Sequence, residues 1–188
     1  MTKDEFMNII KEGKAIEAGS DAHKMLVEYS NDALRITAEL NSSYHEPEQV
    51  RELFSKLIGK EVDDSFFIFP PFYTDFGKNI TVGRNVFINT GCSFQDRGGI
   101  IIGDGAQIGM NVTIATLNHG LDLKTRNTTY ALPVVIGKNV WIGSNATIIP
   151  GVTIGDNSVI AAGAVVVKNI PENVVAAGCP AKPIKNIC

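Results

Sequence analysis

The sequence predicts a mainly β protein, a parallel β-helix of about four coils that follows an N-terminal helical segment. The main observation is that aliphatic or aromatic residues recur at intervals of six over the last two-thirds of the chain. These anchors are Val82, Ile88, Phe94, Ile102, Ile108, Ile114, Ile136, Ile142, Ile148, Ile154, Ile160 and Val166. An α-helix needs apolar residues every three or four positions, and a single strand needs them every two for a few residues only. A sustained period of six therefore indicates short strands that stack in coils, with the anchors pointing inward.

The residues between the anchors support this fold. The position after an anchor is often glycine, as at Gly83, Gly109 and Gly143, and the fourth position after it is small, as at Cys92 and Ala146. We expect the glycines to supply positive φ at sharp corners, and the small side chains to fill the space where the walls converge. Three hexads close one coil, so the anchors give a prism of roughly 19 Å at about 4.8 Å per stacked strand.

The N-terminal segment shows helical spacing in place of hexads. Thr2 and Glu5 form a capping box for a first helix. A second helix is expected over about 22–40, and a third runs from Pro47 until Gly59 ends it. The apolar stripes of these helices need a surface to cover. The open end of the β-helix provides one, and covering it also prevents edge-to-edge growth.

The composition fits a compact chain that we divide into a helical cap, residues 1–60, and a β-helix with a C-terminal tail, residues 61–188. The 188 residues are 44% hydrophobic with a formal net charge of -3, which suffices for a core and gives no sign of nucleic-acid binding. The sequence has no long apolar run or signal peptide, so we expect a cytoplasmic protein without a membrane partner. Cys92, Cys179 and Cys188 are odd in number and far apart, so we expect neither disulfides nor a zinc site.

The hexads are interrupted between Ile114 and Ile136, where an excursion over about 116–133 leaves the coil. Loops of this length in a compact domain are usually functional or disordered. This one contains His119, the only histidine of the repeat region. A lone loop histidine is more often a solvated or structural residue than a catalytic one. On its own, the excursion therefore makes His119 a candidate and no more.

The hexads, the pair Asn118-His119 in the excursion and the segment Asn139-Val140-Trp141-Ile142-Gly143-Ser144 resemble the hexapeptide-repeat acyltransferases. Within them, the pattern is most similar to the maltose and galactoside O-acetyltransferases. The resemblance covers about residues 3–187 and is strongest over 77–184. It implies a left-handed coil, whereas the general rule for parallel crossovers predicts a right-handed one. It also implies a homotrimer with active sites between neighbouring subunits, because the flat faces of a prism can pack under closed cyclic symmetry.

On the acceptor side, the resemblance identifies His119 as the general base, a role that suits imidazole because it titrates near neutral pH. Three further positions match the family's acceptor site: Asn89, Asp75 and Asp96. Asn89 stands where other hexads have glycine, so a left-handed corner conformation could also explain it. The two aspartates could equally be turn formers. The family has an acidic residue after the first helix that binds acceptor hydroxyls; Asp21 is the nearest candidate and Glu17 the next.

On the donor side, six residues match positions that contact coenzyme A in the family: Trp141, Ser144, Ala162, Lys168, Lys182 and Lys185. Trp141 precedes an anchor and should face outward, either as a wall for the pantetheine arm or as a subunit contact. Ser144 and Ala162 would act through their backbone amides, Ser144 at the thioester carbonyl and Ala162 along the arm. Lys168 would bind the cofactor, and the other two lysines would approach its phosphates. Taken alone, lysines in a tail are ordinary solvated charge.

These matches imply an acetyl-CoA-dependent O-acetyltransferase that acetylates a hydroxyl of a sugar or similar small acceptor by direct attack on the thioester, with no metal required. An antibiotic O-acetyltransferase and a serine acetyltransferase share the donor site and stay open as alternatives. A carbonic anhydrase on this fold would need about three histidines around zinc, and His23 and His45 lie outside the repeats. A non-catalytic trimeric scaffold would not need His119, Asn89 and Trp141 together.

Overall fold

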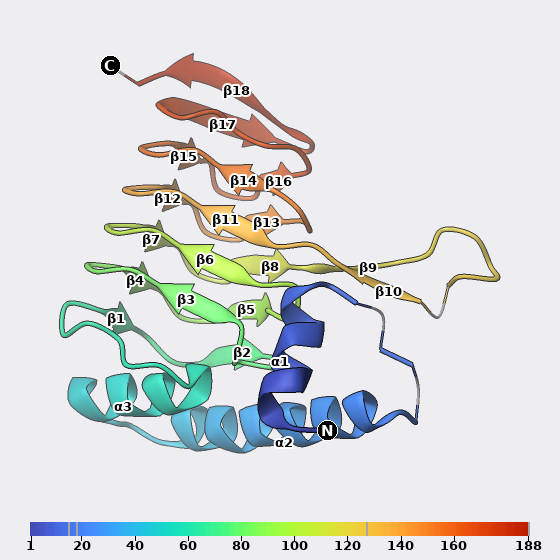
Figure 1. Cartoon of the computed structure of the whole chain (residues 1–188). Coiled ribbons are helices and arrows are strands. Elements are labelled where there is room, and N and C mark those ends of the chain that lie inside the picture. Colours follow the sequence, from blue (N-terminus) through green and yellow to red (C-terminus); the bar gives the residue numbers. More distant parts are fainter. Residues whose placement is uncertain (15, 18, 127, 188) are drawn as a thin grey trace.

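The computed structural model describes residues 1–14, 16–17, 19–126 and 128–187. A prism of stacked strands stands on a layer of helices, with α2 and α3 across its base and α1 against its side (Figure 1). The helices are α1 (Lys3–Lys11), α2 (Asp21–Ser42) and α3 (Pro47–Ile58). Within the described residues, none of them is long and apolar enough to cross a membrane.

All three predicted helices are present. α1 starts at the predicted cap and α3 has both predicted ends, whereas α2 extends from Asp21 to Ser42 where about 22–40 was expected. The Thr2 hydroxyl accepts from the Glu5 amide at 3.2 Å, and the Glu5 carboxylate accepts from the Thr2 amide at 2.7 Å, which is the capping box. Gly59 ends α3 with a φ of +69°. Leu40 of α2 and Phe54 of α3 are fully buried in the main core together with the strands. The division at residue 60 falls between α3 and the first strand and stays a proposal, because one core continues across it.

The strands form three sheets, which are the faces of the prism, and a separate hairpin. The seven-stranded sheet contains β1 (Phe67–Ile68), β4 (Phe87–Ile88), β7 (Gln107–Ile108), β12 (Trp141–Ile142), β15 (Val159–Ile160), β17 (Val174–Gly178) and β18 (Ala181–Asn186). The five-stranded sheet contains β2 (Phe72–Thr74), β5 (Cys92–Gln95), β8 (Thr113–Ala115), β13 (Thr147–Ile148) and β16 (Val165–Val166). The four-stranded sheet contains β3 (Ile80–Val82), β6 (Ile100–Ile102), β11 (Val134–Ile136) and β14 (Thr153–Ile154). The hairpin consists of β9 (Leu117–His119) and β10 (Thr129–Ala131).

The predicted fold class, a mainly β chain that forms a parallel β-helix under a helical cap, is confirmed. Each complete coil takes one strand from the four-, the seven- and the five-stranded sheet in turn, and anchors stack on anchors, as Ile108 does on Ile88 and Ile142 on Ile108. Four complete coils run from β3 to β16. The count of about four is low, because β1 and β2 form a partial coil below them and β17 belongs to another above.

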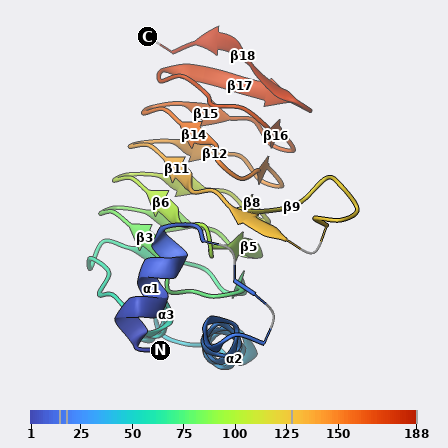
Figure 2. The same ribbon diagram turned by 45° about the vertical axis from the view of Figure 1, so that its right-hand side comes forward.

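Three corners join the faces of the prism. Corner I leads from the seven-stranded to the five-stranded sheet, corner II from the five-stranded to the four-stranded sheet, and corner III from the four-stranded to the seven-stranded sheet. The hairpin leaves the prism at corner II, between β8 and β11, as the turned view shows (Figure 2). The upper end of the prism is closed by β18, which pairs antiparallel with β17.

The glycines after the anchors serve a different purpose from the one predicted. Positive φ occurs two positions further on, at residues such as Asn85, Gly91, Asn145 and Gly163. Gly143 itself does not have a positive φ, but a Cβ on it would lie 2.5 Å from the backbone nitrogen of Ala162 in the next coil. Glycine is therefore required at Gly143 because the neighbouring coil passes too close for a side chain.

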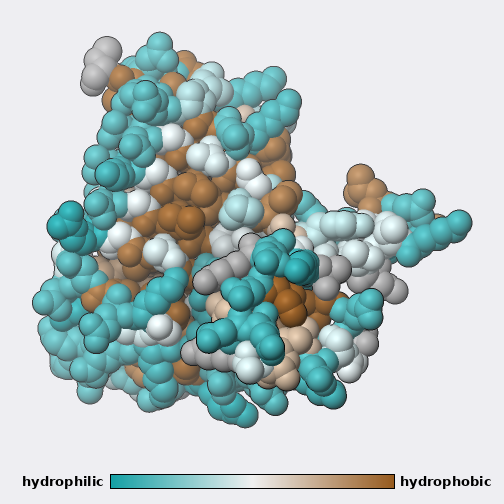
Figure 3. Space-filling model, viewed as in Figure 1, coloured by the Kyte–Doolittle hydropathy of each residue, from teal (hydrophilic) through white to brown (hydrophobic). Residues whose placement is uncertain are grey.

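A second interruption of the hexads escaped the sequence analysis. Phe94 and Ile102 are eight positions apart where six would close the coil, and the two extra residues widen corner II. Asp96 lies in this wider turn and is fully buried. Figure 3 shows hydrophobic residues gathered on the face of the prism above the helices. On the four-stranded sheet, the outward-facing Ile101 is 48% exposed.

Candidate functional site

His119 lies at the end of β9, on the hairpin that projects from corner II. It pairs with Thr129 of β10, and its side chain is exposed. Its Nδ1 is 2.9 Å from the backbone carbonyl oxygen of Arg126. A carbonyl oxygen only accepts, so Nδ1 carries the proton in this hydrogen bond, and Nε2 of a neutral ring keeps its lone pair. The hairpin thus presents an imidazole whose free nitrogen can take up a proton.

Asn89 lies at corner I, directly after β4. It does not have a positive φ, so the explanation of Asn89 as a left-handed corner residue is wrong. Its carbonyl oxygen accepts from the Thr90 amide at 2.8 Å, which fixes the side chain. Among the described residues, its NH₂ group has no hydrogen-bond acceptor. Asn89 therefore offers a positioned, half-buried donor at this corner.

Ser144 and Ala162 occupy the same corner in the two coils above. In the lower coils the amide at this position is bonded to a side chain: that of Thr90 to Asn89, and that of Met110 to the Ser144 hydroxyl at 3.2 Å. For Ser144 and Ala162 no such acceptor is present among the described residues. Corner I therefore carries two stacked backbone N–H groups that are free to bind an oxygen outside the chain.

Trp141 faces outward, as predicted, and is 55% exposed. It pairs with Gln107 of the coil below and with Val159 of the coil above, and Val159 pairs with Val175 of β17. Side chains at paired positions lie on the same side of a sheet. Trp141 therefore belongs to an outward row on the seven-stranded face, next to corner I.

Asp96 is not exposed at the site, although the sequence predicts a contact with the acceptor. One of its oxygens accepts from the Thr74 hydroxyl at 2.6 Å, the Gly77 amide at 2.8 Å and the Phe76 amide at 3.2 Å, and the other from the Asn79 amide at 3.0 Å. A fully buried carboxylate with four donors is a clamp for the turn at 74–79 and has no free oxygen for a ligand. The direct acceptor contact predicted for Asp96 is therefore not supported.

Asp75, in contrast, is only partly buried and lines a groove on the outer side of the five-stranded sheet. The groove has a volume of about 590 Å³, and its other walls include Leu34 of α2, Tyr73, Ser93, Gln95 and Thr113. One Asp75 oxygen accepts from the Asp96 amide at 3.0 Å. Burial and the neighbouring Asp96 carboxylate raise the pKa of Asp75 to about 7, opposed by the Asp96 amide and the positive charge of Arg97.

Asp21 is the first residue of α2 and is exposed. Its carboxylate forms an ion pair with Lys24 at 2.9 Å, and that hydrogen bond lowers the pKa of Asp21 below its ordinary value. Among the described residues, no hydrogen bond joins Asp21 to His119, Asn89 or Asp75. Within one chain, the predicted acceptor contact of Asp21 stays a prediction.

The repeats match two family models. Residues 79–115 match the model described as hexapeptide repeat of succinyl-transferase, and residues 133–168 match bacterial transferase hexapeptide (six repeats). A galactoside O-acetyltransferase of Escherichia coli is 42% identical over 151 residues, which cover 79% of this chain and 74% of the relative. The chain belongs to the hexapeptide-repeat acetyltransferases. Two solved structures of this family match the chain over its whole length.

Two structures of this family superimpose closely on the chain. A maltose O-acetyltransferase from Clostridium difficile 630 has a TM-score of 0.89 and 38% identity, with 100% of this chain and 98% of that chain covered. A hexapeptide-repeat acetyltransferase from Vibrio cholerae O1 biovar eltor, solved with acetyl coenzyme A, has a TM-score of 0.84 and 30% identity, with both chains covered completely. The resemblance seen in the sequence motifs is thereby confirmed.

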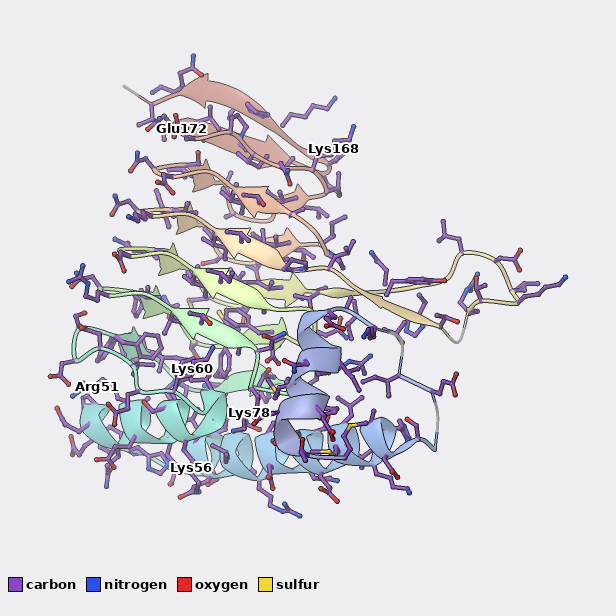
Figure 4. All side chains as sticks on the ribbon, viewed as in Figure 1. Arg51, Lys56, Lys60, Lys78, Lys168 and Glu172 are labelled. Carbon is purple, nitrogen blue, oxygen red and sulfur yellow. The ribbon has the colours of Figure 1, made fainter. Side chains whose placement is uncertain are left out.

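In this hexapeptide-repeat acetyltransferase, two of the predicted donor-side lysines lie on the face of Trp141. Lys185 pairs with Val175 across β17 and β18, and Lys182 pairs with Ala177. Both lysines are exposed and extend the outward row of the seven-stranded face toward its upper end. Lys168 is also exposed but lies beyond β16, on the side from which the hairpin projects (Figure 4).

The fold brings the predicted residues together in two groups, which lie at different corners. Asn89, Ser144, Ala162 and Trp141 gather at corner I, whereas His119 is carried by the hairpin from corner II. The strands of the five-stranded sheet separate the two corners. The groove residues Tyr73, Ser93 and Thr113 were not predicted, although they precede or follow inward positions in the hexads and could have been assigned to the outer face. Arg126 was not predicted either, because the hexads give no signal for it.

Proposed function

We propose that this acetyltransferase transfers the acetyl group of acetyl-CoA to a hydroxyl group of a sugar or similar small acceptor, with His119 as the general base. The observation that carries the proposal is the bond from Nδ1 of His119 to the Arg126 carbonyl, which leaves Nε2 as the proton acceptor on an exposed hairpin. The galactoside and maltose O-acetyltransferases named above support a sugar acceptor. The Vibrio cholerae relative supports acetyl-CoA as the donor.

The reaction follows from the two groups of residues. Nε2 of His119 takes the proton of the acceptor hydroxyl while its oxygen attacks the thioester carbonyl. The C–O bond of the ester forms, the C–S bond breaks, and the coenzyme A thiolate recovers the proton from the imidazolium. The free Ser144 amide donates a hydrogen bond to the thioester oxygen as negative charge develops on it. No acyl-enzyme is involved, because the acceptor attacks directly.

The donor would lie along corner I. The Ala162 amide would bind the pantetheine arm, the exposed indole of Trp141 would cover it, and Lys182 and Lys185 would attract the phosphates from the end of the same row. Asn89, with its free NH₂ group, would hold the acceptor beside the thioester. Asp75 would line the acceptor groove, with Asp96 supporting it from inside.

A homotrimer with shared sites would join the two groups. His119 and corner I are separated within one chain, so the base of one subunit would serve the donor corner of the next. The tip of the hairpin supports an intermolecular role, because Leu121 is 94% and Leu123 is 85% exposed. Apolar side chains on a projecting arm are covered most simply by a neighbouring subunit. In a trimer with closed three-fold symmetry, each of the three arms would pack against the next subunit in the same way.

The experiment that tests the function is a thiol-release assay with His119→Gln. We expect turnover to fall by about 10²- to 10⁴-fold, with the KM for acetyl-CoA nearly unchanged, because a general base acts on the chemical step. Since His119 is exposed, the thermal midpoint should not change. His45→Gln, which replaces a histidine between α2 and α3, is the matched control and should behave like the wild type.

The choice of acceptor is tested in the same assay with galactosides, maltose, chloramphenicol and serine as acceptors. Release of free coenzyme A thiol with sugars supports the proposed acceptor class. A strong preference for the antibiotic or for serine would select one of the alternative O-acetyltransferases. No release with any hydroxyl compound, or normal turnover in folded His119→Gln, would contradict the proposal.

A further inference from the structure

Arg126 is hydrogen-bonded to three consecutive residues: His119, the last residue of β9, and Gly120 and Leu121 directly after it. Its carbonyl oxygen accepts from Nδ1 of His119 at 2.9 Å. Its side chain reaches back across the turn, where Nε donates to the Gly120 carbonyl at 2.9 Å and a terminal nitrogen donates to the Leu121 carbonyl at 3.0 Å. One residue thus bonds the imidazole through its backbone and the chain just after the imidazole through its guanidinium.

Among the described residues, the imidazole of His119 has no hydrogen bond other than the one to the Arg126 carbonyl. His119 and Arg126 are both exposed, on an arm that projects from the prism, so packing does not fix the ring. The tautomer of His119 therefore depends on the Arg126 carbonyl. The position of that carbonyl depends in turn on the conformation of the exposed turn that carries it. The guanidinium supplies that placement, because it ties the turn to Gly120 and Leu121.

The turn that contains Gly120 and Arg126 is tightly packed and hydrogen-bonded. Gly120 is buried although it lies in the arm, and a Cβ on it would be 2.2 Å from the hydroxyl oxygen of Thr125. The Gly120 amide donates to the Thr128 carbonyl at 3.2 Å, and the Thr125 amide donates to the Asp122 carbonyl at 3.0 Å. The arm ends in a compact hydrogen-bonded loop, and Gly120 makes it tight, contrary to the looser loop that a glycine suggests.

We propose that Arg126 is a positioning residue: its guanidinium locks the turn so that its own carbonyl keeps the proton of His119 on Nδ1 and leaves Nε2 free as the base. This inference rests on the role of His119 in the proposed function. Arginine suits the task because its planar fork carries donors that can reach two carbonyl oxygens at once, whereas lysine has one ammonium group at the end of a flexible stem. A substitution that keeps the charge alone should therefore keep only part of the effect.

The direct test is the tautomer of His119, which needs no acceptor. The chain has three histidines, so long-range ¹H–¹⁵N spectra of protein labelled in histidine give few signals, and His119→Gln identifies the one of interest. In the wild type, at a pH where the ring is neutral, we expect the Nδ1–H tautomer of His119 alone. In Arg126→Ala we expect a mixture with the Nε2–H tautomer, and in Arg126→Lys a smaller share of it.

The second readout is turnover. In Arg126→Ala, kcat should fall by roughly tenfold with the KM for acetyl-CoA unchanged. The reason is that the chemical step loses the contribution of about one hydrogen bond to the orientation of the imidazole. Lys124→Ala is the matched control, because Lys124 is an exposed cation in the same turn whose side chain makes none of these bonds. It should leave the tautomer and kcat unchanged.

The outcomes separate this inference from the proposed function. A wild-type His119 that carries its proton on Nε2, or an Arg126→Ala variant that keeps the Nδ1–H tautomer alone, overturns the role of Arg126 whatever the activity. A tautomer shift in Arg126→Ala with unchanged kcat also overturns it, because the orientation would then not matter for turnover. If the wild type releases no thiol with any acceptor, the function fails while the spectra still decide whether Arg126 sets the tautomer.

Discussion

Asp75 and Asp96 place two carboxyl groups side by side at the turn beside the groove on the five-stranded sheet. The Asp96 carboxylate accepts from four donors and lies next to Asp75. Burial of Asp75 and the charge of Asp96 together raise the pKa of Asp75 from 3.8 to about 7. Between these two pH values the folded chain binds a proton that the unfolded chain does not. The stability gained in this way is complete below about pH 4 and is lost as the pH rises through about 7.

Replacing Asp75 by Asn should remove this loss, because the amide keeps the shape of the neutral acid. We expect the thermal midpoint of Asp75→Asn, measured by calorimetry, to rise relative to that of the wild type as the pH increases from 5 to 8. Asp64→Asn changes an exposed carboxyl group near β1 and should follow the wild type at every pH. If the thermal midpoints of Asp75→Asn and the wild type change with pH in parallel, the pKa of Asp75 is not raised in the folded protein.

Single residues are where the sequence predicted least well. The hexads place Asn89 at a corner and Trp141 on the outer face, as the structure does, because each repeat meets the same surroundings and such a position can be counted from the anchors. The burial of Asp96 could not be counted in this way, because it depends on the two extra residues of corner II. The hydrogen bond between Arg126 and His119 depends on hairpin pairing, which no periodicity in the arm reveals.

At the scale of elements, β18 extends the face that carries Trp141 and adds Lys182 and Lys185 to it. If these lysines meet phosphates, they do so as exposed charges, and their attraction should weaken as salt screens it. We expect Lys182→Gln/Lys185→Gln to raise the KM for acetyl-CoA and to flatten its dependence on salt. kcat at saturating donor should stay near the wild-type value, because binding far from the thioester is uniform binding.

The control for this double variant is Arg84→Gln/Lys138→Gln, which removes two exposed cations from corner III. It lowers the net charge equally, so it separates a local phosphate contact from a general electrostatic effect. A donor KM that responds to salt identically in both double variants would identify Lys182 and Lys185 as ordinary solvated charge.

The elements themselves were predictable for physical reasons. The start of α1 and the end of α3 were predicted correctly because the capping residues Thr2 and Gly59 act locally, within one turn of the chain. The strands were correct because their period is sustained over four coils. The excursion over 116–133 was expected, but its β9–β10 pairing was not, since short exposed strands lack the alternation of apolar residues that marks a strand.

At the scale of the whole molecule, the separation of His119 from corner I predicts that activity requires assembly. Mixing His119→Gln with Ala162→Trp, which places an indole over the free amides of corner I, tests this after both variants are unfolded and refolded together. If sites are shared in a trimer, random assembly should restore about one quarter of the wild-type rate per chain, because one site in four combines an intact hairpin with an intact corner.

Sedimentation of each variant and of the mixture is the control, since all should have the same size as the wild type. If each site lies within one chain, the mixture stays as inactive as its components. A wild-type monomer that sediments as such and turns over at full rate on dilution would also rule out shared sites.

The overall architecture could be predicted from spacing, but its hand could not. The general preference of parallel crossovers is right-handed, and only the similarity to a known family pointed to the left-handed coil. The number of coils was underestimated at the two ends, where β1, β2 and β17 depart from the hexads as they meet the cap and β18.

The hairpin enters the chain between β8 and β11 without disturbing any ladder: β11 resumes pairing with β6 in register, and β13 with β8. Insertion or loss of residues in the arm therefore carries no penalty for the stacked coils. The arm that carries His119 can therefore change in length and sequence independently of the coils, while corner I, with the free amides of Ser144 and Ala162, keeps its geometry. The same junction, between Thr116 and Pro133, is where an arm from another member of the family can be grafted without disturbing the stacked coils.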